Sequence, residues 1–278
     1  RVEFFRFPTD RGWTRDCGPI FARCGAPRAA VSNFKFQSLR LKSPAQKGTG
    51  IYFRRKVMEI KVVKKVLGVN EAIAEEIRKQ LKEKKIFMFN IMSSPGSGKT
   101  LLLEKSIAAL KNDVRIGIIV GDICTTRDSE RLSKTGVPVV QINTEPFGGD
   151  CHLAANLIQS ALNELDLDNL DIVIVENVGN LVCPAEFEIG EDKKVVVLSL
   201  PEGEDKPLKY PLMFRVAHCA IINKIDLEPH LELDRSKFRE NIKKINPQIH
   251  LFELSAKTGE GFKDWLEWIW REAKTKIS

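Results

Sequence analysis

The chain has 278 residues and a mass of 31.4 kDa, with 43% hydrophobic and 29% charged residues. This composition excludes a disordered or fibrous protein and allows a substantial core. No stretch reaches the roughly 18 uncharged apolar residues of a membrane helix, and the first residues lack the layout of a secretory signal. Six cysteines without a dense framework are typical of a reducing compartment. We therefore expect a cytoplasmic protein that does not span a membrane.

The net charge of +7 is unevenly distributed along the chain. Residues 1–57 carry 13 Lys/Arg and 3 Asp/Glu, whereas residues 58–278 carry 31 Lys/Arg and 34 Asp/Glu. The basic residues 1–57 could contact RNA, DNA or an anionic membrane, but the main body has no positive excess for such a partner, so we expect neither a nucleic-acid nor a membrane partner. Residues 43–50 are rich in Pro, Gly and Ser and show no hydrophobic periodicity, which is typical of a linker. We expect residues 1–57 to form a basic leader and linker, and residues 58–278 to form the functional domain.

Hydrophobic patterning predicts a repeating strand–helix order. Ile73, Ile77 and Leu81 recur at helical spacing and predict a first helix. Short β-branched runs then predict strands at Ile86–Met92, Val114–Val120, Val137–Ile142, Ile172–Val175, Val195–Leu200, Ala220–Ile222 and Ile249–Leu254. Amphipathic stretches between them predict helices at Leu101–Leu110, Leu153–Leu165 and Ser236–Ile245. This alternation predicts an α/β fold, with a mainly parallel sheet, strands buried on both faces and helices on both sides.

A glycine-rich loop lies between the first expected strand and the helix Leu101–Leu110. Its residues are Ser94, Pro95, Gly96, Ser97, Gly98, Lys99 and Thr100. A loop of this kind between a strand and a helix is typical of a P-loop, whose backbone N–H groups and helix N-terminus surround phosphates. In that role Lys99 contacts the β- and γ-phosphates, and Thr100 offers its hydroxyl to Mg²⁺. One departure from the G-x-x-x-x-G-K-[ST] template is Ser93, which replaces the first glycine.

Two later motifs indicate that the nucleotide is GTP or GDP. The Asp226 carboxylate in Asn223-Lys224-Ile225-Asp226 can accept hydrogen bonds from N1–H and the exocyclic amine of guanine, a donor pair that adenine lacks. The aliphatic part of Lys224 can cover the base. Ser255, Ala256 and Lys257 follow the last strand, where a backbone N–H can reach guanine O6. The order of these motifs behind a P-loop predicts a GTPase.

Two acidic residues at strand ends are candidates for binding Mg²⁺ beside Thr100. The strand Ile172–Val175 leads into Glu176, and Gly179 follows three residues later, as in the second Mg²⁺-side element of such NTPases. Asp122, after the second strand, is the other candidate. With Lys99, these residues form the predicted catalytic set. The alternative is that each acid only satisfies local hydrogen bonds.

Three further residues suggest a separate metal site. Cys151 and His152 are predicted to open the helix Leu153–Leu165, and Cys183 follows the Glu176 element. Thiolate and imidazole ligands suit Zn²⁺ and Ni²⁺, and a helix N-terminus lowers the pKa of a cysteine. Three ligands leave a tetrahedral ion one short, so water or a symmetric dimer would complete the site. From these residues alone, the alternative remains one buried cysteine, one exposed histidine and an unrelated second cysteine.

The complete set of motifs resembles the HypB family, the nickel-insertion GTPases of [NiFe]-hydrogenase maturation. The resemblance covers about residues 58–278 and rests on S-S-P-G-S-G-K-T, G-D-C-H-L-A-A, E-N-V-G-N-L-V-C-P, L-P-E-G-E-D-K-P-L-K-Y-P and N-K-I-D. It implies a SIMIBI-class P-loop GTPase that forms a GTP-dependent homodimer, with a nickel or zinc site built from Cys151, His152 and Cys183. It also implies two partners, a HypA-like nickel chaperone and the precursor of the hydrogenase large subunit.

Two alternatives and two departures accompany this resemblance. The urease-side family UreG typically has Cys-Pro-His, whereas Cys151 and His152 are adjacent here. A metal-storage or scaffold protein with vestigial GTPase activity is disfavoured by the intact phosphate-side residues. The N-terminal C-x-x-C-G-C motif of many HypB proteins is missing, which argues against a separate nickel store. About residues 1–36 resemble a fragment of agmatine and peptidyl-arginine deiminases, through the segment 9–21 with Trp13 and Asp16, and this fragment is too short to fold alone.

Overall fold

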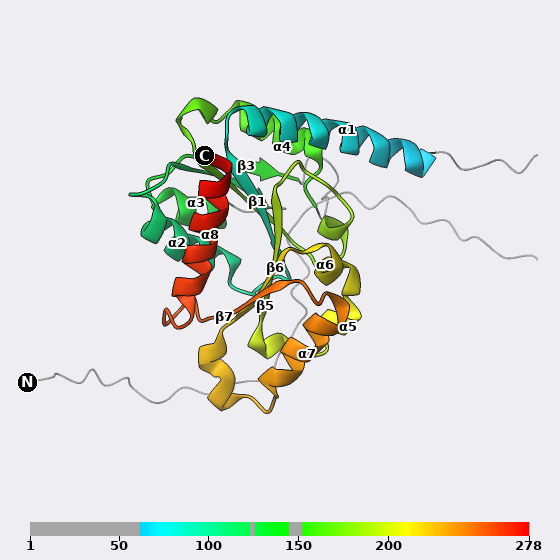
Figure 1. Cartoon of the computed structure of the whole chain (residues 1–278), viewed down its shortest axis with the longest axis vertical. Helices are drawn as coiled ribbons and strands as arrows, with labels where there is room; N and C mark the ends of the chain where they lie inside the picture. The colour runs from blue at the N-terminus through cyan, green and yellow to red at the C-terminus, as the bar shows by residue number, and fades with distance from the viewer. Residues whose placement is uncertain (1–61, 123–125, 145–151, 278) are drawn as a thin grey trace, which may run out of the picture. The chain divides into compact units, whose positions relative to one another are not determined.

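The computed structural model describes residues 62–122, 126–144 and 152–277 (Figure 1). All of them belong to the unit Met58–Ser278. The predicted leader 1–57, the deiminase-like segment within it and the predicted metal ligand Cys151 lie outside the described residues. In the part of the chain that is described, no helix has the length and apolar character needed to cross a membrane.

A seven-stranded sheet with the order β3-β2-β4-β1-β5-β6-β7 forms the centre of the described unit. All adjacent strands pair in parallel. The strands are β1 Phe87–Ser93, β2 Ile116–Asp122, β3 Val139–Asn143, β4 Ile172–Gly179, β5 Lys193–Ser199, β6 Cys219–Asn223 and β7 His250–Glu253. The predicted strands and the α/β class with a parallel sheet are confirmed. The prediction that every strand is buried on both faces is wrong for the edge strands β3 and β7, which are partly exposed because each pairs on one side only.

Helices cover both faces of the sheet (Figure 1). The helices α2, α3 and α8 lie on one face, and α1 and α4 lie together on the other, where α6 and α7 cover the strands β5 and β6. Their bounds are α1 Val62–Glu83, α2 Lys99–Leu110, α3 Arg127–Ser133, α4 Ala155–Asn163, α5 Lys206–Lys209, α6 Pro211–Val216, α7 Arg235–Ile245 and α8 Phe262–Ile277. Short segments of 3-10 helix, named below where they matter, join several of these elements.

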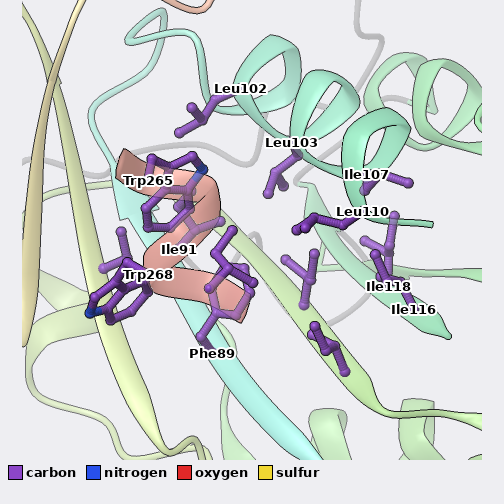
Figure 2. Packing of buried hydrophobic residues seen from close by; sticks show 14 of the residues in the cluster. Phe89, Ile91, Leu102, Leu103, Ile107, Leu110, Ile116, Ile118, Trp265 and Trp268 are labelled. Atoms are coloured by element: carbon purple, nitrogen blue, oxygen red, sulfur yellow. The ribbon is translucent and has the colours of Figure 1, made fainter. Parts of the chain in front are cut away.

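Aromatic packing fixes α8 on the first face of the sheet (Figure 2). Trp265 and Trp268 of α8 stack with ring centroids 5.3 Å apart, and Trp265 meets the edge of Phe89 in β1 at 6.0 Å. The Trp265 indole N–H donates to Ser106 Oγ of α2 at 2.9 Å, so its polar atom is satisfied inside the core. This packing holds α2 firmly against the sheet. The helix α2 follows the glycine-rich loop of residues 94–100, which is called the phosphate loop below.

Side chains of successive residues in the central strands point to opposite faces of the sheet. In β1, Phe87, Phe89 and Ile91 pack in the cluster beneath α2 and α8, whereas Met88 packs in the cluster beneath α1 and α4. Since all strands are parallel, their carboxyl ends meet at one edge of the sheet, which is where ligands bind in open α/β folds. The predicted site residues follow these carboxyl ends.

Candidate functional site

The loop between β1 and α2 depends on two glycines. Gly96 and Gly98 have φ angles of 78° and 95°, in the left-handed region that favours glycine. A Cβ at Gly98 would also lie only 2.6 Å from Asn223 Nδ2. Gly98 is therefore required twice, for its backbone conformation and for the close approach of the loop that follows β6.

Ser93, at the position of the missing glycine, holds the lysine of the loop. It is the last residue of β1 and fully buried. Lys99 Nζ donates to Ser93 Oγ at 2.8 Å, and that hydroxyl donates to the Ser94 carbonyl at 2.6 Å. Burial lowers the pKa of Lys99, against the opposing influence of nearby carboxylates, chiefly Glu176. The serine thus positions the ammonium group that is predicted to contact phosphate.

A cavity of roughly 470 Å³ opens beside this loop. Besides the loop itself, it is lined by the ends of β2 and β4 and by one side chain of the N-K-x-D motif, namely Gly121, Asp122, Glu176, Asn177, Val178, Gly179 and Lys224. Asp128 and Arg131 of α3 also line it, and neither residue is among those predicted from the sequence. Arg131 donates twice to Glu104 of α2, at 3.0 and 2.6 Å, which fixes its guanidinium beside the cavity. The only sequence signal for α3 was its short D-x-x-R spacing.

The acid at the end of β4 meets the hydroxyl at the start of α2. Thr100 Oγ1 donates to Glu176 Oε1 at 3.0 Å. The buried Oε2 of Glu176 has no hydrogen-bond partner among the residues that the structure describes. Burial is the main cause that raises the pKa of Glu176 from 4.5 to about 7, and the charge of Lys99 opposes the rise.

These groups fit a divalent cation such as Mg²⁺. An unsatisfied buried carboxylate oxygen, a hydroxyl and an adjacent phosphate cavity form the donor set that this ion prefers. Within the described ranges, no three His, Cys, Asp or Glu side chains form a closed metal cage. Mg²⁺ does not need such a cage, because it usually keeps several waters and binds through one or two protein oxygens together with phosphates.

The end of β4 also packs directly on the phosphate loop. A Cβ at Gly179 would lie 3.2 Å from both N and Cγ of Pro95, closer than ordinary contact. A larger residue here would press on Pro95, so glycine allows the close approach of β4 to the loop. The segment from Glu176 to Gly179 therefore contacts the start of α2 at one end, through Thr100, and the phosphate loop at the other, beside Pro95.

The predicted base-reading motifs meet the phosphate loop on its other side. Asn223 Nδ2 donates to the Ser97 carbonyl at 2.9 Å, and Lys224 Nζ donates to the Gly96 carbonyl at 2.7 Å. Lys224 itself has a positive φ of 62°. The loop after β6 is thereby tied to the phosphate loop by two side chains.

The S-A-K segment is joined to the N-K-x-D motif by two further bonds. The Ala256 N–H donates to Asn223 Oδ1 at 3.0 Å, and Ser255 Oγ donates to Asp226 Oδ1 at 2.5 Å. Asp226 lies in the 3-10 segment Ile225–His230. The structure thus brings the three motifs together, although Ala256 uses its N–H within the protein. The contact of this segment with guanine stays a prediction, as does the role of Asp226.

The helix that was predicted to begin at Leu153, beside the predicted metal ligand His152, begins later in the structure. The helix α4 begins at Ala155, with Ala154 as its N-cap, so Leu153 is not helical and His152 does not open the helix. The His152 ring stacks on Phe187 with centroids 3.8 Å apart. Cys183 is partly exposed and begins the 3-10 segment Cys183–Ala185. His152 therefore lies against the chain that follows Cys183, while the complete ligand set stays a prediction because it includes Cys151.

Glu202 is a further residue at the site, and it was not predicted from the sequence. It accepts hydrogen bonds from Ser94 Oγ in the phosphate loop and, at 2.8 Å each, from the N–H and Oγ of Ser199. The S-x-x-E capping box of the 3-10 segment Leu200–Glu202 was the signal that could have revealed it. This contact joins the L-P-E-G-E-D-K-P segment to the phosphate loop.

Comparison with known proteins identifies the relatives of this chain. Residues 87–253 match the sequence profile of the CobW/HypB/UreG nucleotide-binding domain. Hydrogenase maturation factor HypB of Escherichia coli K12 is 44% identical over 216 residues, which span 78% of this chain and 73% of that protein. The probable hydrogenase maturation factor HypB of Methanocaldococcus jannaschii is 42% identical over 77% of this chain and 95% of that protein.

The chain belongs to the HypB family. Its fold is correspondingly similar to two solved structures. HypB from Helicobacter pylori in complex with nickel superposes with a TM-score of 0.70, at 37% identity over 76% of this chain and 97% of that one. HypB from Archaeoglobus fulgidus also has a TM-score of 0.70, at 38% identity over 74% and 100% of the two chains. The resemblance to HypB and the P-loop NTPase fold that it implied are thereby confirmed.

Proposed function

We propose that this HypB-family protein is a GTP-hydrolysing metallochaperone whose nucleotide state gates nickel delivery during maturation of a [NiFe]-hydrogenase. The observation that carries the proposal is the convergence on one phosphate loop of Glu176 through Thr100 and of Asn223 through the Ser97 carbonyl. The first contact belongs to phosphate and Mg²⁺ chemistry, and the second orients the motif that reads guanine. The solved relative from Helicobacter pylori that binds nickel supplies the cargo.

In this proposal Asp226 accepts from the guanine edge, and the side chain of Lys224 covers the base. Ser255 holds the Asp226 carboxylate by donating to its Oδ1. Since the Ala256 N–H is bound to Asn223, the next peptide N–H, that of Lys257, is the group proposed to reach O6. Backbone N–H groups of residues 94–100 surround the phosphates, as expected for a glycine-rich loop before a helix.

Hydrolysis is proposed to rely on charge placement around the γ-phosphate. Lys99 exchanges its bond to Ser93 for phosphate oxygens. Thr100 and Glu176 would hold Mg²⁺, with Asp122 in its outer shell, and the ion would neutralise charge that develops on the phosphates. Glu176 becomes ionised when a cation is present, because the cation offsets the cost of burying its charge. These residues need no further cofactor.

Nickel is the proposed cargo, bound by Cys151, His152 and Cys183, with zinc as the competing ion. Cysteine and histidine ligands suit both metals. Three ligands per chain favour a site that two copies complete together. A GTP-dependent homodimer is further supported by Leu208 and Leu212, which are 52% and 38% exposed in the segment that Glu202 joins to the phosphate loop. The proposed partners are a HypA-like nickel chaperone and the hydrogenase large-subunit precursor.

Size-exclusion chromatography with bound-metal analysis, run with GDP and with a non-hydrolysable GTP analogue, tests this function. We expect a dimer with the analogue and a nickel affinity that differs between the two states. In a separate hydrolysis assay, we expect the protein to turn over GTP but not ATP. Nickel binding without GTP turnover would favour the scaffold alternative. Hydrolysis of ATP at the same rate would contradict the assignment of the base-reading motifs.

A further inference from the structure

Strand β4 presents consecutive polar residues to opposite faces of the sheet. Glu176 lies on the face of α2, where Thr100 contacts it. Asn177 lies on the face of α1 and α4, because successive strand residues alternate. Both side chains are buried, at 3% and 2% exposure. A shift of the end of β4 therefore acts on both faces of the sheet at once.

On its own face, Asn177 binds the segment that carries His152. Asn177 Oδ1 accepts from the Leu153 N–H at 3.3 Å and from the Val178 N–H at 2.9 Å. Leu153 directly follows His152, and its buried side chain fills the space over Gly121, where a Cβ would lie 2.7 Å from Leu153 Cδ1. The peptide after His152 is thus held by β4 and packed on β2, the two strands whose ends line the nucleotide cavity.

A chain of buried polar groups fixes the amide of Asn177. Asn177 Nδ2 donates to Asn90 Oδ1 and Asn90 Nδ2 donates to Glu191 Oε1, both at 3.2 Å. Lys194 Nζ donates to Glu191 Oε1 at 2.8 Å and to the Phe187 carbonyl at 3.2 Å. All four charged or amide side chains of this chain are at most 5% exposed. Such a satisfied network has one preferred arrangement, because leaving any buried member unpaired is costly.

The two ends of this network meet at His152. One end is the bond from the Leu153 N–H to Asn177, and the other is Phe187, whose ring stacks on His152. Apolar residues could fill the same space and support the sheet equally well. The polar chain instead contacts both flanks of a predicted metal ligand and begins beside the predicted Mg²⁺ ligand Glu176. A role in coupling the site at Glu176 to the segment that carries His152 accounts for both ends of the network.

We propose that Asn177 is the positioning residue through which the nucleotide state of the cavity reaches the metal-binding segment. This inference rests on the proposed function, since it concerns nickel bound at Cys151, His152 and Cys183. When γ-phosphate moves the segment Glu176–Gly179, Asn177 moves with it and carries the Leu153 peptide, and therefore His152. Linkage requires the effect to be mutual, so bound nickel shifts nucleotide affinity by the same factor.

The test is nickel titration of the full chain with Mg²⁺ and either GDP or a non-hydrolysable GTP analogue. The readouts are the ratio of the two nickel affinities and the thiolate-to-nickel absorption band. The wild type is expected to show a ratio of about 5–150, the usual range of coupling between sites. Asn177→Ala is expected to bring the ratio close to one while keeping the absorption band, since no ligand has been removed.

A matched control separates coupling from stability. Asn246 is another amide that binds carbonyls, those of Phe214 and Ala217 at 3.0 Å each, and it lies outside this network. Asn246→Ala should lower the melting temperature and leave the ratio unchanged. If Asn177→Ala does not fold, Asn90→Ala is measured instead, since it keeps the bond to Leu153 but removes the anchor of Asn177. It should reduce the ratio.

Two outcomes distinguish the failure of this inference from that of the proposed function. A wild-type ratio of one would contradict nucleotide-gated nickel binding itself. A wild-type ratio above one that persists in a folded Asn177→Ala protein, or in Asn90→Ala when that variant is the one measured, would overturn the role of Asn177 alone. The reciprocal measurement, GTP-analogue affinity with and without nickel, must give the same factor in each protein.

Discussion

Thr100 Oγ1 donates to one oxygen of Glu176, while the other oxygen of this carboxyl is buried without a hydrogen-bond partner among the described residues. Without a bound cation, the Glu176 carboxyl is therefore in an environment that disfavours its negative charge. A cation beside Thr100 would reverse this preference. We therefore expect the protonation of Glu176 to depend on whether a metal ion is bound beside Thr100.

The first prediction concerns the pH dependence of the nucleotide-free protein. The folded pKa of Glu176 is about 7, above the ordinary 4.5. Between these values the folded state holds a proton that the unfolded state has lost, so raising the pH disfavours folding. The free energy of unfolding should fall from pH 4.5 to 7 by about 3 kcal/mol from this group. Denaturant melts across this range measure it.

Glu176→Gln is the matched variant, because it keeps the shape of the side chain and removes its titration. Its unfolding free energy should lack this component of the fall. With Mg²⁺ and nucleotide bound, the wild type should lose the dependence too, and binding near pH 6 should release a proton that calorimetry in two buffers detects. A wild type and Glu176→Gln with parallel pH profiles would contradict the raised pKa.

The second prediction uses two glycines that share a backbone conformation. Gly98→Ala should reduce nucleotide affinity, because its Cβ would force the Asn223 amide away from the phosphate loop. Gly136→Ala is the control, since Gly136 has a φ of 83° but its Cβ would meet nothing within 4 Å. Both should lose about 1 kcal/mol of stability from left-handed strain. Equal nucleotide affinities in the two variants, measured with a fluorescent GTP analogue, would contradict the role of the Gly98–Asn223 contact.

The sequence alone was sufficient for the parts of the site whose chemistry is local. The phosphate loop is one continuous segment between a strand and a helix, and the N-K-x-D motif begins at the last residue of β6, so residue types and spacing locate both segments in the sequence. Ser93 shows the limit of templates. It departs from the glycine pattern but lies in a strand, where no left-handed backbone is required, and its hydroxyl binds Lys99.

Contacts between distant segments could not be predicted in this way. Asn177 and Asn90 are 87 residues apart, and nothing in either neighbourhood indicates that their amides meet. The start of α4 was misplaced because apolar periodicity continues through Leu153, whose N–H is bound by Asn177 instead of a helix. Arg131 was missed because the orientation of a seven-residue helix is decided by packing, here by its bonds to Glu104.

The third prediction addresses the choice of base. Asp226→Asn should cost about 1.5–3 kcal/mol of GTP affinity, because guanine donors lose their charged acceptor. It should also shift preference towards xanthine nucleotides, which present an acceptor where guanine has the amine. Competition binding with GTP, XTP and ATP measures this. Ser255→Ala, which removes only the bond that holds Asp226, should weaken GTP binding less and leave the preference for guanine intact.

The fourth prediction concerns the exposed leucines. Leu208→Asp should abolish the dimer that forms with a GTP analogue, because it places a charge where apolar surface is to be buried. Val69→Asp, at another exposed apolar position in α1, is the control and should dimerise normally. Nucleotide affinity measured at dilutions where the protein is monomeric should be unchanged in both. Sedimentation velocity with each nucleotide distinguishes these outcomes, and a normal dimer of Leu208→Asp would place the interface elsewhere.

The last prediction separates the metal site from the nucleotide site. Cys183→Ala and Cys151→Ala should each weaken nickel binding by more than about tenfold, since even residues that only support a ligand typically contribute this much. GTP affinity in metal-free buffer should stay near that of the wild type, because Cys183 does not line the described nucleotide cavity and both cysteines are proposed to bind metal only. Cys219→Ala is the matched control. That thiol is fully buried in β6, and burial raises its pKa well above the ordinary value, which disfavours the thiolate that binds metal. Nickel titration of the three variants decides the point: equal losses in Cys219→Ala and Cys183→Ala would mean that the effect reflects stability, and an unchanged affinity in Cys183→Ala would remove that residue from the ligand set.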